Sequence, residues 1–225
     1  MRPRQKIPLE KIVAWLHLIE ATNLPKPVWL EEKQVFEYEK VTVEIVAFLK
    51  MTRAVQSLHS LPLLCRAGLF LDYETIIRCI QECCNQTMFL LENYPEITPA
   101  AKKFVEHFEC TTIDEHLEEK STAVQSTKIH SANARILERA GFSFDDGKKL
   151  IDRAYKAMST STHSLYAATM QMYGGPHGQY KFQVRGIPSE RMKKVQAEWI
   201  DVLNITVTHA LYFLALALKA EDIIA

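Results

Sequence analysis

The stretch Tyr155–Tyr166, YKAMSTSTHSLY, gathers side chains that are suited to proton transfer and hydrogen bonding. It holds two tyrosines, one histidine and five serine or threonine hydroxyls. Histidine changes its protonation state near neutral pH, and neighbouring hydroxyls can orient it or a substrate. The stretch therefore predicts either a site for acid–base chemistry or the polar face of an ordinary helix.

A helical period separates the polar side chains of this stretch from the apolar ones. Tyr155, Ser159, Thr162, His163 and Tyr166 fall on one stripe, and a second stripe of the same helix is apolar. The apolar stripe is expected to face the core. The polar stripe must then lie on the surface or line a cleft.

The surrounding segment is basic, although the whole chain is neutral. No acidic residue occurs between Asp152 and Glu190, and four of the eight tyrosines and four of the seven glycines fall in this span. Glycine-rich loops offer backbone N–H donors, and aromatic rings can stack on bases. We therefore expect phosphate or a nucleic-acid base as the ligand. The residues expected to bind it are Arg153, Tyr166, Lys181 and Arg185.

Other ligand-binding motifs are missing from the sequence. No Gly-Lys-Ser/Thr occurs, which argues against a nucleotide triphosphate site. Cys79 and Cys83 lie one helical turn apart, but no histidine at a helical spacing completes a tetrahedral metal site. Glu-x-x-His pairs, which build metal centres in helical bundles, are also missing. We expect no metal and no cofactor.

The composition predicts an all-α protein. The 225 residues are 48% hydrophobic and 24% charged, with only 7 glycines and 9 prolines to form turns. Hydrophobic periodicity and capping signals predict six or seven helices, with no strand-period segment longer than about five residues. These helices are expected to form a single domain spanning residues 1–225, in which the helices of residues 1–61 pack against residues 62–225. The expected helices cover residues 8–22, 30–61, 62–92, 98 onward, 112–141, 143–174 and 188–218, with a break at Leu61-Pro62.

Charge and cysteine content bear on location and partners. Because 27 basic residues balance 27 acidic ones, any nucleic-acid partner requires a local patch. The five cysteines form an odd set, and the N-terminus does not match a secretory signal, so we expect a reduced, cytoplasmic protein. The longest apolar run, Ala210–Leu218, covers about half of the ~18 to 20 residues needed to cross a membrane. We interpret it as a buried core helix.

Two motifs resemble those of a known superfamily. ETIIRCIQECC carries Arg78 and Glu82 on one expected helix, and the Tyr155–Tyr166 stretch follows about 80 residues later, before Gly-Gly and a last apolar helix. This arrangement resembles the HEPN-like all-helical superfamily, in particular a bacterial branch of uncharacterised domains with an Arg-x-x-x-Glu helix and a Tyr/Ser/His helix. The similarity extends from Pro62 to the C-terminus.

The resemblance implies a helical homodimer that acts on RNA in bacterial defence or toxin–antitoxin systems, where an antitoxin or another protein can be the partner. Active members are metal-independent endoribonucleases. Their chemistry would make His163 the acid or base, with Ser159 and Tyr155 orienting it. Arg78 or Arg153 would contact the phosphate, and Glu82 would hold Arg78.

An alternative is a non-catalytic helical interaction module. Active HEPN ribonucleases have four to six residues between an arginine and the histidine, so the arginine lies five to seven positions before it. The nearest arginine before His163 is Arg153, ten positions away. In this alternative the polar cluster only joins two helices, and the last helix supplies a dimer face. The surroundings of His163 distinguish the two hypotheses: an open cleft with arginine within reach favours catalysis, and apolar neighbours favour the module.

Overall fold

The computed structural model describes residues 7–109, 124–163, 170, 173–174, 181–182 and 190–224. These residues are mostly helical, which confirms the predicted helical class. The helices are α1 (Leu9–Asn23), α2 (Val43–Ala67), α3 (Phe70–Leu91), α4 (Pro99–Glu109), α6 (Ser126–Arg139), α7 (Phe144–Thr162), α9 (Glu190–Ala217) and α10 (Glu221–Ile224). The strands are β1 (Val28–Leu30), β2 (Val35–Glu37), β3 (Tyr173–Gly174) and β4 (Lys181–Phe182).

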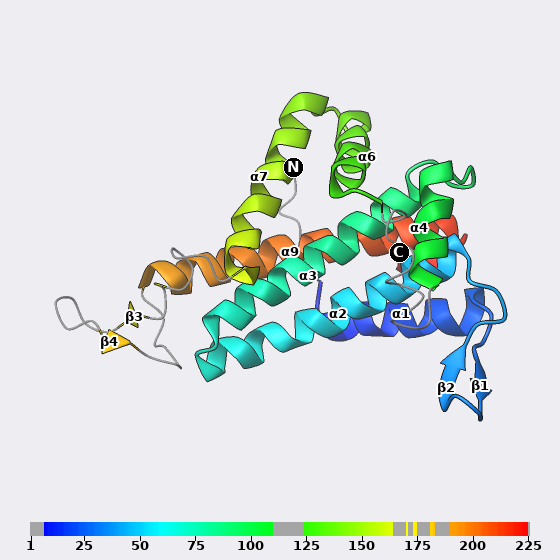
Figure 1. Ribbon diagram of the computed structural model, residues 1–225, viewed down its shortest axis with the longest axis horizontal. Coiled ribbons are helices and arrows are strands. Elements are labelled where there is room, and N and C mark those ends of the chain that lie inside the picture. Colours follow the sequence, from blue (N-terminus) through cyan, green and yellow to red (C-terminus); the bar gives the residue numbers. More distant parts are fainter. Residues whose placement is uncertain are drawn as a thin grey trace.

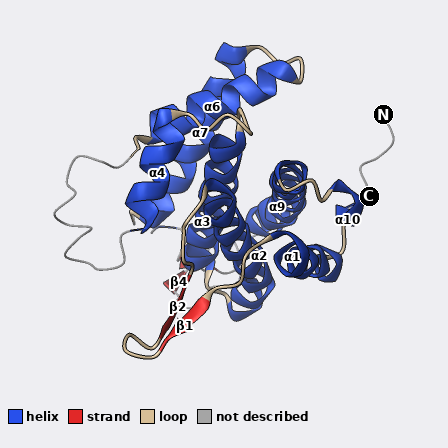
Figure 2. Cartoon of the chain, turned by 90° about the vertical axis from the view of Figure 1, so that its right-hand side faces the viewer, coloured by secondary structure: helices blue, strands red, loops and turns tan. Residues whose placement is uncertain are grey.

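Helix α3 lies at the middle of the molecule. Helices α1, α2, α3 and α9 run lengthwise, and the α6–α7 pair stands across them (Figure 1). Figure 2 shows α3 between this pair and the other lengthwise helices. Helix α3 packs against α2, α6, α7 and α9. Each of these four helices can therefore bring side chains to a site on α3.

Helix α2 continues through Pro62, so the predicted break at Leu61-Pro62 is wrong. Pro62 is exposed, and the helix accommodates a proline there although it lacks a backbone donor. The chain turns at Gly68, which has a φ of 72°. The N–H groups of Gly68 and Leu69 donate to the carbonyls of Cys65 and Leu64 at 3.1 and 3.0 Å. A glycine at this left-handed position terminates the helix better than the proline does.

Two small antiparallel hairpins lie where parts of two helices were expected. In the first, Val28 pairs with Glu37 and Leu30 with Val35, within a segment that we expected to begin a long helix. In the second, Tyr173 pairs with Phe182. Helix α7 ends at Thr162, so the predicted helix does not extend to Gly174. Period-2 patterns of two or three residues are too short to read from a sequence.

Several predicted helix ends are confirmed by their capping contacts. The Oγ1 of Thr98 accepts a hydrogen bond from the N–H of Ala101 at 3.1 Å, at the start of α4. The Oγ of Ser143 accepts from the N–H of Asp146 at 3.4 Å, at the start of α7. Gly141, with a φ of 92°, follows the end of α6. The helix start predicted at Thr112 lies outside the described residues.

The apolar run Ala210–Leu218 is buried on only one face. Ala210, Leu211 and Leu214 are fully buried, whereas Tyr212 and Leu216 are exposed. The expectation that the whole run lies at the centre of the core is therefore only partly correct. Only one face of α9 is buried, because α2 and α3 pack against one side of this helix.

Among the described residues, one stretch of α9 has the length and composition of a membrane span. It covers Trp199–Ala217, with a mean hydropathy of 1.5 and 44% of its residues buried. Core helices of soluble proteins have the same properties, and the buried face of this helix packs within the chain.

Glu92 attaches α6 to the end of α3. Its side chain is almost completely buried, and its two carboxylate oxygens accept hydrogen bonds from Nε and Nη2 of Arg135 at 2.5 and 2.8 Å. Arg139 donates to the Glu92 carbonyl oxygen at 2.7 Å. Hydrogen bonding to Glu92 raises the pKa of Arg135. A bidentate ion pair of this kind fixes the relative orientation of its two side chains as well as their distance. It therefore holds α6, and with it α7, at a defined angle to α3.

Candidate functional site

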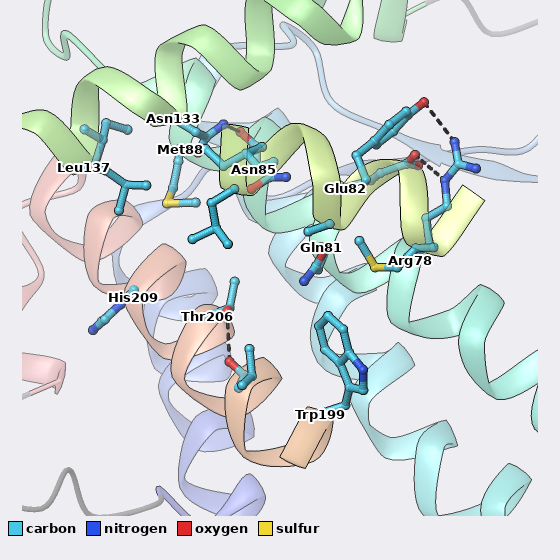
Figure 3. A pocket seen from close by; sticks show the side chains of 17 residues that line it. Arg78, Gln81, Glu82, Asn85, Met88, Asn133, Leu137, Trp199, Thr206 and His209 are labelled. Carbon is cyan, nitrogen blue, oxygen red and sulfur yellow. Dashed lines mark hydrogen bonds and ion pairs between the residues drawn. The ribbon is translucent and has the colours of Figure 1, made fainter. Parts of the chain in front are cut away.

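Arg78 of α3 connects two of the predicted site residues. Its Nε donates to Oε1 of Glu82 at 2.8 Å, and its Nη2 donates to the hydroxyl of Tyr155 on α7 at 3.0 Å. Its Cζ atom lies 4.7 Å from the centroid of the Tyr155 ring. The Arg78 side chain is only 13% exposed. Figure 3 draws the two hydrogen bonds of Arg78 as dashed lines.

The polar network continues from Tyr155 into α6. The ring of His130 contacts the Tyr155 ring edge-on, with 4.9 Å between centroids. The Nδ1 of His130 lies 2.7 Å from Oδ1 of Asp152, and Oδ2 of Asp152 accepts from Lys148 at 2.7 Å. Two hydrogen bonds lower the pKa of Asp152, and the one from Lys148 contributes more than the one from His130. One chain of contacts thus crosses α3, α7 and α6.

A cleft of about 340 Å³ opens beside this network. Its floor is α3, one wall is formed by α6 and α7, and the other wall is α9 (Figure 3). Arg78, Glu82 and Tyr155 line it, together with mostly apolar side chains. Its volume is within the range of small-molecule sites.

The structure brings together three predicted catalytic residues and leaves two apart. Arg78, Glu82 and Tyr155 are in contact. Ser159 donates its hydroxyl to the Tyr155 carbonyl oxygen at 2.8 Å, within the helix. His163 is exposed just beyond the end of α7, eight residues after Tyr155, and does not line the cleft. Eight residues correspond to about 12 Å along a helix, so His163 and Arg78 are not adjacent.

The predicted binding residues lie on the surface where they are described. Arg153 is exposed on α7, and Lys181 is exposed on β4. Tyr166 and Arg185 lie outside the described residues.

An exposed basic row runs along the outer face of α7. It consists of Lys149, Arg153, Lys156 and His163, which we call the outer row; all four are exposed. Their spacing of four, three and seven residues places them on one helical face. Within the described part of the chain, no ion pair involves Lys149, Arg153 or Lys156. These charges are therefore available to an anionic partner.

Sequence reasoning missed His130 and Asp152, and it did not assemble the outer row. His130 and Asp152 lie on different helices, 22 positions apart, and only the packing of α6 on α7 brings them to 2.7 Å. No sequence spacing could have paired them. The outer row follows a helical spacing, and that spacing was the signal that could have revealed it.

We call Arg78, Glu82, Tyr155 and His130 the inner cluster. Little unpaired charge is available for catalysis in this cluster. Glu82 neutralises the charge of Arg78, and Tyr155 accepts from its Nη2, whereas its buried Nη1 has no hydrogen-bond partner among the described residues. Among the described residues, no group of three histidine, cysteine, aspartate or glutamate side chains is arranged to hold a metal. The cluster instead holds α7 in a fixed rotation about its own axis.

A scan against protein-family models and searches of curated proteins and of solved structures found no match to this chain. Its function therefore has to be inferred from the side chains that α3, α6, α7 and α9 bring together.

Proposed function

We propose that this protein is a HEPN-like, RNA-directed protein that binds RNA along the outer face of α7. The observation that carries the proposal is the outer row, Lys149, Arg153, Lys156 and His163, exposed on one helical face. From Lys149 to His163 the row covers 14 residue steps, which is about 21 Å along a helix. A row of this length can contact several phosphates of one strand.

The charge distribution supports an anionic polymer as the ligand. The chain as a whole has no net charge, yet α7 and the following segment carry no acidic residue after Asp152 until Glu190. Asp152 itself already bonds to His130 and Lys148. Lysine and arginine side chains with few competing carboxylates attract a phosphate backbone, and the outer row offers them beyond the first turn of α7, which itself carries two exposed aspartates.

The inner cluster positions the outer row. Arg78 and His130 both contact Tyr155, which lies on the inner side of α7. Rotation of α7 about its axis would break both contacts. The network therefore keeps Arg153 and Lys156 directed toward solvent.

We propose that the protein binds RNA without cleaving it. Cleavage through the ribose 2′-hydroxyl requires a base and a cation that neutralises the phosphate at the same position. Arg153 lies ten residues before His163, about 15 Å along a helix, and Arg78 is paired with Glu82. Neither arginine is adjacent to His163, which favours binding over catalysis.

The experiment measures binding of a fluorescently labelled single-stranded RNA by anisotropy over a series of salt concentrations. We expect wild type to bind and the triple variant Lys149→Gln, Arg153→Gln, Lys156→Gln to lose most of its affinity. Loss of three phosphate contacts should reduce the slope of log affinity against log salt by about 2.

The matched control removes the same charge elsewhere. Lys26, Lys40 and Lys102 are also exposed, and they lie outside α7. The triple glutamine variant at these positions should bind RNA like wild type. Equal losses in both triple variants would mean that only net charge matters, and no binding by wild type would refute the proposal.

Electrophoresis of the RNA after incubation in EDTA tests cleavage. We expect intact RNA with wild type and with His163→Ala. If wild type shortens the RNA in EDTA and His163→Ala does not, the protein is a metal-independent ribonuclease and the binding-only proposal is wrong.

A dimerisation module is the second candidate function, and one observation favours it. Helix α9 exposes Tyr212 and Leu216, one helical turn apart, on the side away from its buried face. The resemblance to HEPN-like proteins implies a homodimer, and exposed apolar side chains on one helix can supply the contact. Sedimentation of wild type and of Leu216→Glu tests this: a dimer that the substitution dissociates would support it, and a monomeric wild type would refute it.

A further inference from the structure

The cleft between α7 and α9 has apolar walls that nothing in the described chain covers. Leu137 and Leu150 contribute to one wall, Trp199 and Val202 to the other, and Met88 to the floor. Leu150 is 67% exposed and Val202 is 47% exposed, although both line the cleft. Covering such side chains with an apolar ligand would be favourable.

The charges around the cleft favour a neutral ligand. Its lining includes one arginine and one acidic residue, Arg78 and Glu82, whose opposite charges pair, although Nη1 of Arg78 is buried without a hydrogen-bond partner among the described residues. His209 lies exposed at the α9 wall. A charged molecule in the cleft would lose water without gaining an unpaired opposite charge, which costs free energy.

Asn133 offers an acceptor at the cleft. Its Nδ2 donates to the carbonyl oxygens of Asn85 and Ile129 at 3.0 and 2.8 Å, which fixes the orientation of the amide. Its Oδ1 is buried and has no hydrogen-bond partner among the described residues. An unpaired buried acceptor costs free energy, and a ligand N–H or O–H group would satisfy it.

We propose that this cleft binds a neutral, mostly apolar small molecule that carries one hydrogen-bond donor. The site is distinct from the outer row, because the cleft is lined by the inner side of α7 through Leu150, Ala154 and Met158. Its volume of about 340 Å³ suits a molecule with two or three rings or an equivalent chain. Ligand binding here and RNA binding on the outer face can therefore be tested separately.

The probe is N-phenyl-1-naphthylamine, which is neutral, apolar and has a single N–H donor. Its fluorescence rises in apolar surroundings, and it accepts excitation energy from tryptophan. We expect saturable binding to wild type at one site, with energy transfer from Trp199, which lines the cleft. Trp199→Phe should reduce the energy transfer while the directly excited probe still reports binding.

The sulfonated analogue of the probe, 1-anilinonaphthalene-8-sulfonate, has the same rings and a negative charge. It should bind the wild-type protein at least about tenfold more weakly than the neutral probe. Equal or tighter binding of the sulfonate would overturn the assignment of a neutral ligand.

Filling the cleft from either wall tests the location. Ala154→Phe on α7 and Thr206→Leu on α9 place extra atoms in the cleft, and each should weaken probe binding by about tenfold or more. Ala157→Phe is the matched control, because Ala157 is exposed on the same helix and does not line the cleft. Circular dichroism identifies any variant that fails to fold.

Two further results would refute the proposal. One is probe binding that neither filling substitution changes in folded protein. The other is a probe affinity that falls as the protein concentration rises and the protein self-associates. In that case a second copy of the chain would occupy the cleft.

Discussion

The Nη2 atom of Arg78 donates a hydrogen bond of 3.0 Å to the hydroxyl of Tyr155, and the two residues are 77 positions apart. This bond joins α3 to α7 at the edge of the cleft. It orients the inner face of α7 toward Arg78 and leaves Lys149, Arg153 and Lys156 on the outer face. Both the proposed RNA surface and the proposed ligand cleft depend on this rotation of α7.

Tyr155→Phe should lower the free energy of unfolding by about 1 to 2 kcal/mol, because it removes the acceptor of a charged donor and retains the ring. Unfolding in urea, followed by circular dichroism, measures the change. Tyr212→Phe is the control, since Tyr212 is exposed on α9, and it should change stability by less than about 0.5 kcal/mol. Equal effects of the two substitutions would show that the Arg78 contact contributes nothing.

Asp152→Asn should destabilise the protein near pH 7 and weaken its acid sensitivity. Hydrogen bonds from Lys148 and His130 lower the pKa of Asp152 in the folded protein. A lowered pKa stabilises the fold above the unfolded value of about 4, and this stabilisation is lost as pH falls through the folded pKa. We expect a loss of about 1 kcal/mol at pH 7 that shrinks below pH 4. Thermal melts from pH 3 to 7 measure it.

Asp146→Asn is the control for this pH series, because Asp146 is exposed in the first turn of α7. It should leave the difference between pH 7 and pH 3 close to that of wild type. A wild-type pH profile in the Asp152→Asn variant would contradict the proposed network.

Cys79 should react with iodoacetamide at lower pH than an ordinary thiol. A hydrogen bond from Cys83 is the main cause that lowers the pKa of Cys79, and Ser57 Oγ lies 3.8 Å from its sulfur. The same interaction and burial raise the pKa of Cys83. Because the thiolate is the reactive form, alkylation of Cys79 should reach half its maximal rate at a pH below that of an ordinary thiol.

Cys83→Ala removes the donor to Cys79, and Cys83→Ser retains one. The alanine variant should shift the midpoint of the alkylation profile of Cys79 upward by about 1 to 2 pH units, and the serine variant should stay close to wild type. Mass spectrometry of the alkylated peptides separates Cys79 from Cys65. Identical profiles for both variants would show that Cys83 does not activate Cys79.

Pro62→Ala should stabilise the protein by about 1 to 3 kcal/mol, because alanine restores a backbone donor inside α2 and is the better helix former. Pro62 is exposed, so no packing is lost. Leu63→Ala at the neighbouring exposed position is the control and should change stability by less than about 0.5 kcal/mol. Destabilisation by Pro62→Ala would indicate that the chain is not helical at this position.

The helical class and many helix ends could be predicted from local signals alone. The low glycine content and the long helical periods favour helices. The caps at Thr98 and Ser143 fix helix ends through contacts within a few residues, so these features can be predicted from the local sequence. The prediction failed at Pro62, where tertiary packing of α2 outweighs the local preference for a break. It also failed at the hairpins, whose strands are too short to show a pattern.

The candidate site also combines features that the local sequence predicts with features that only the tertiary structure decides. Arg78 and Glu82 share a helix at a spacing of four residues, and the outer row follows a helical spacing on α7, so the sequence alone determines these spacings, while the exposure of the outer row depends on how α7 packs. The contacts of Arg78 with Tyr155, and of His130 with Asp152, join different helices. Only the tertiary structure decides them, because the angle at which α6 and α7 cross α3 depends on the whole core, and no local pattern encodes it.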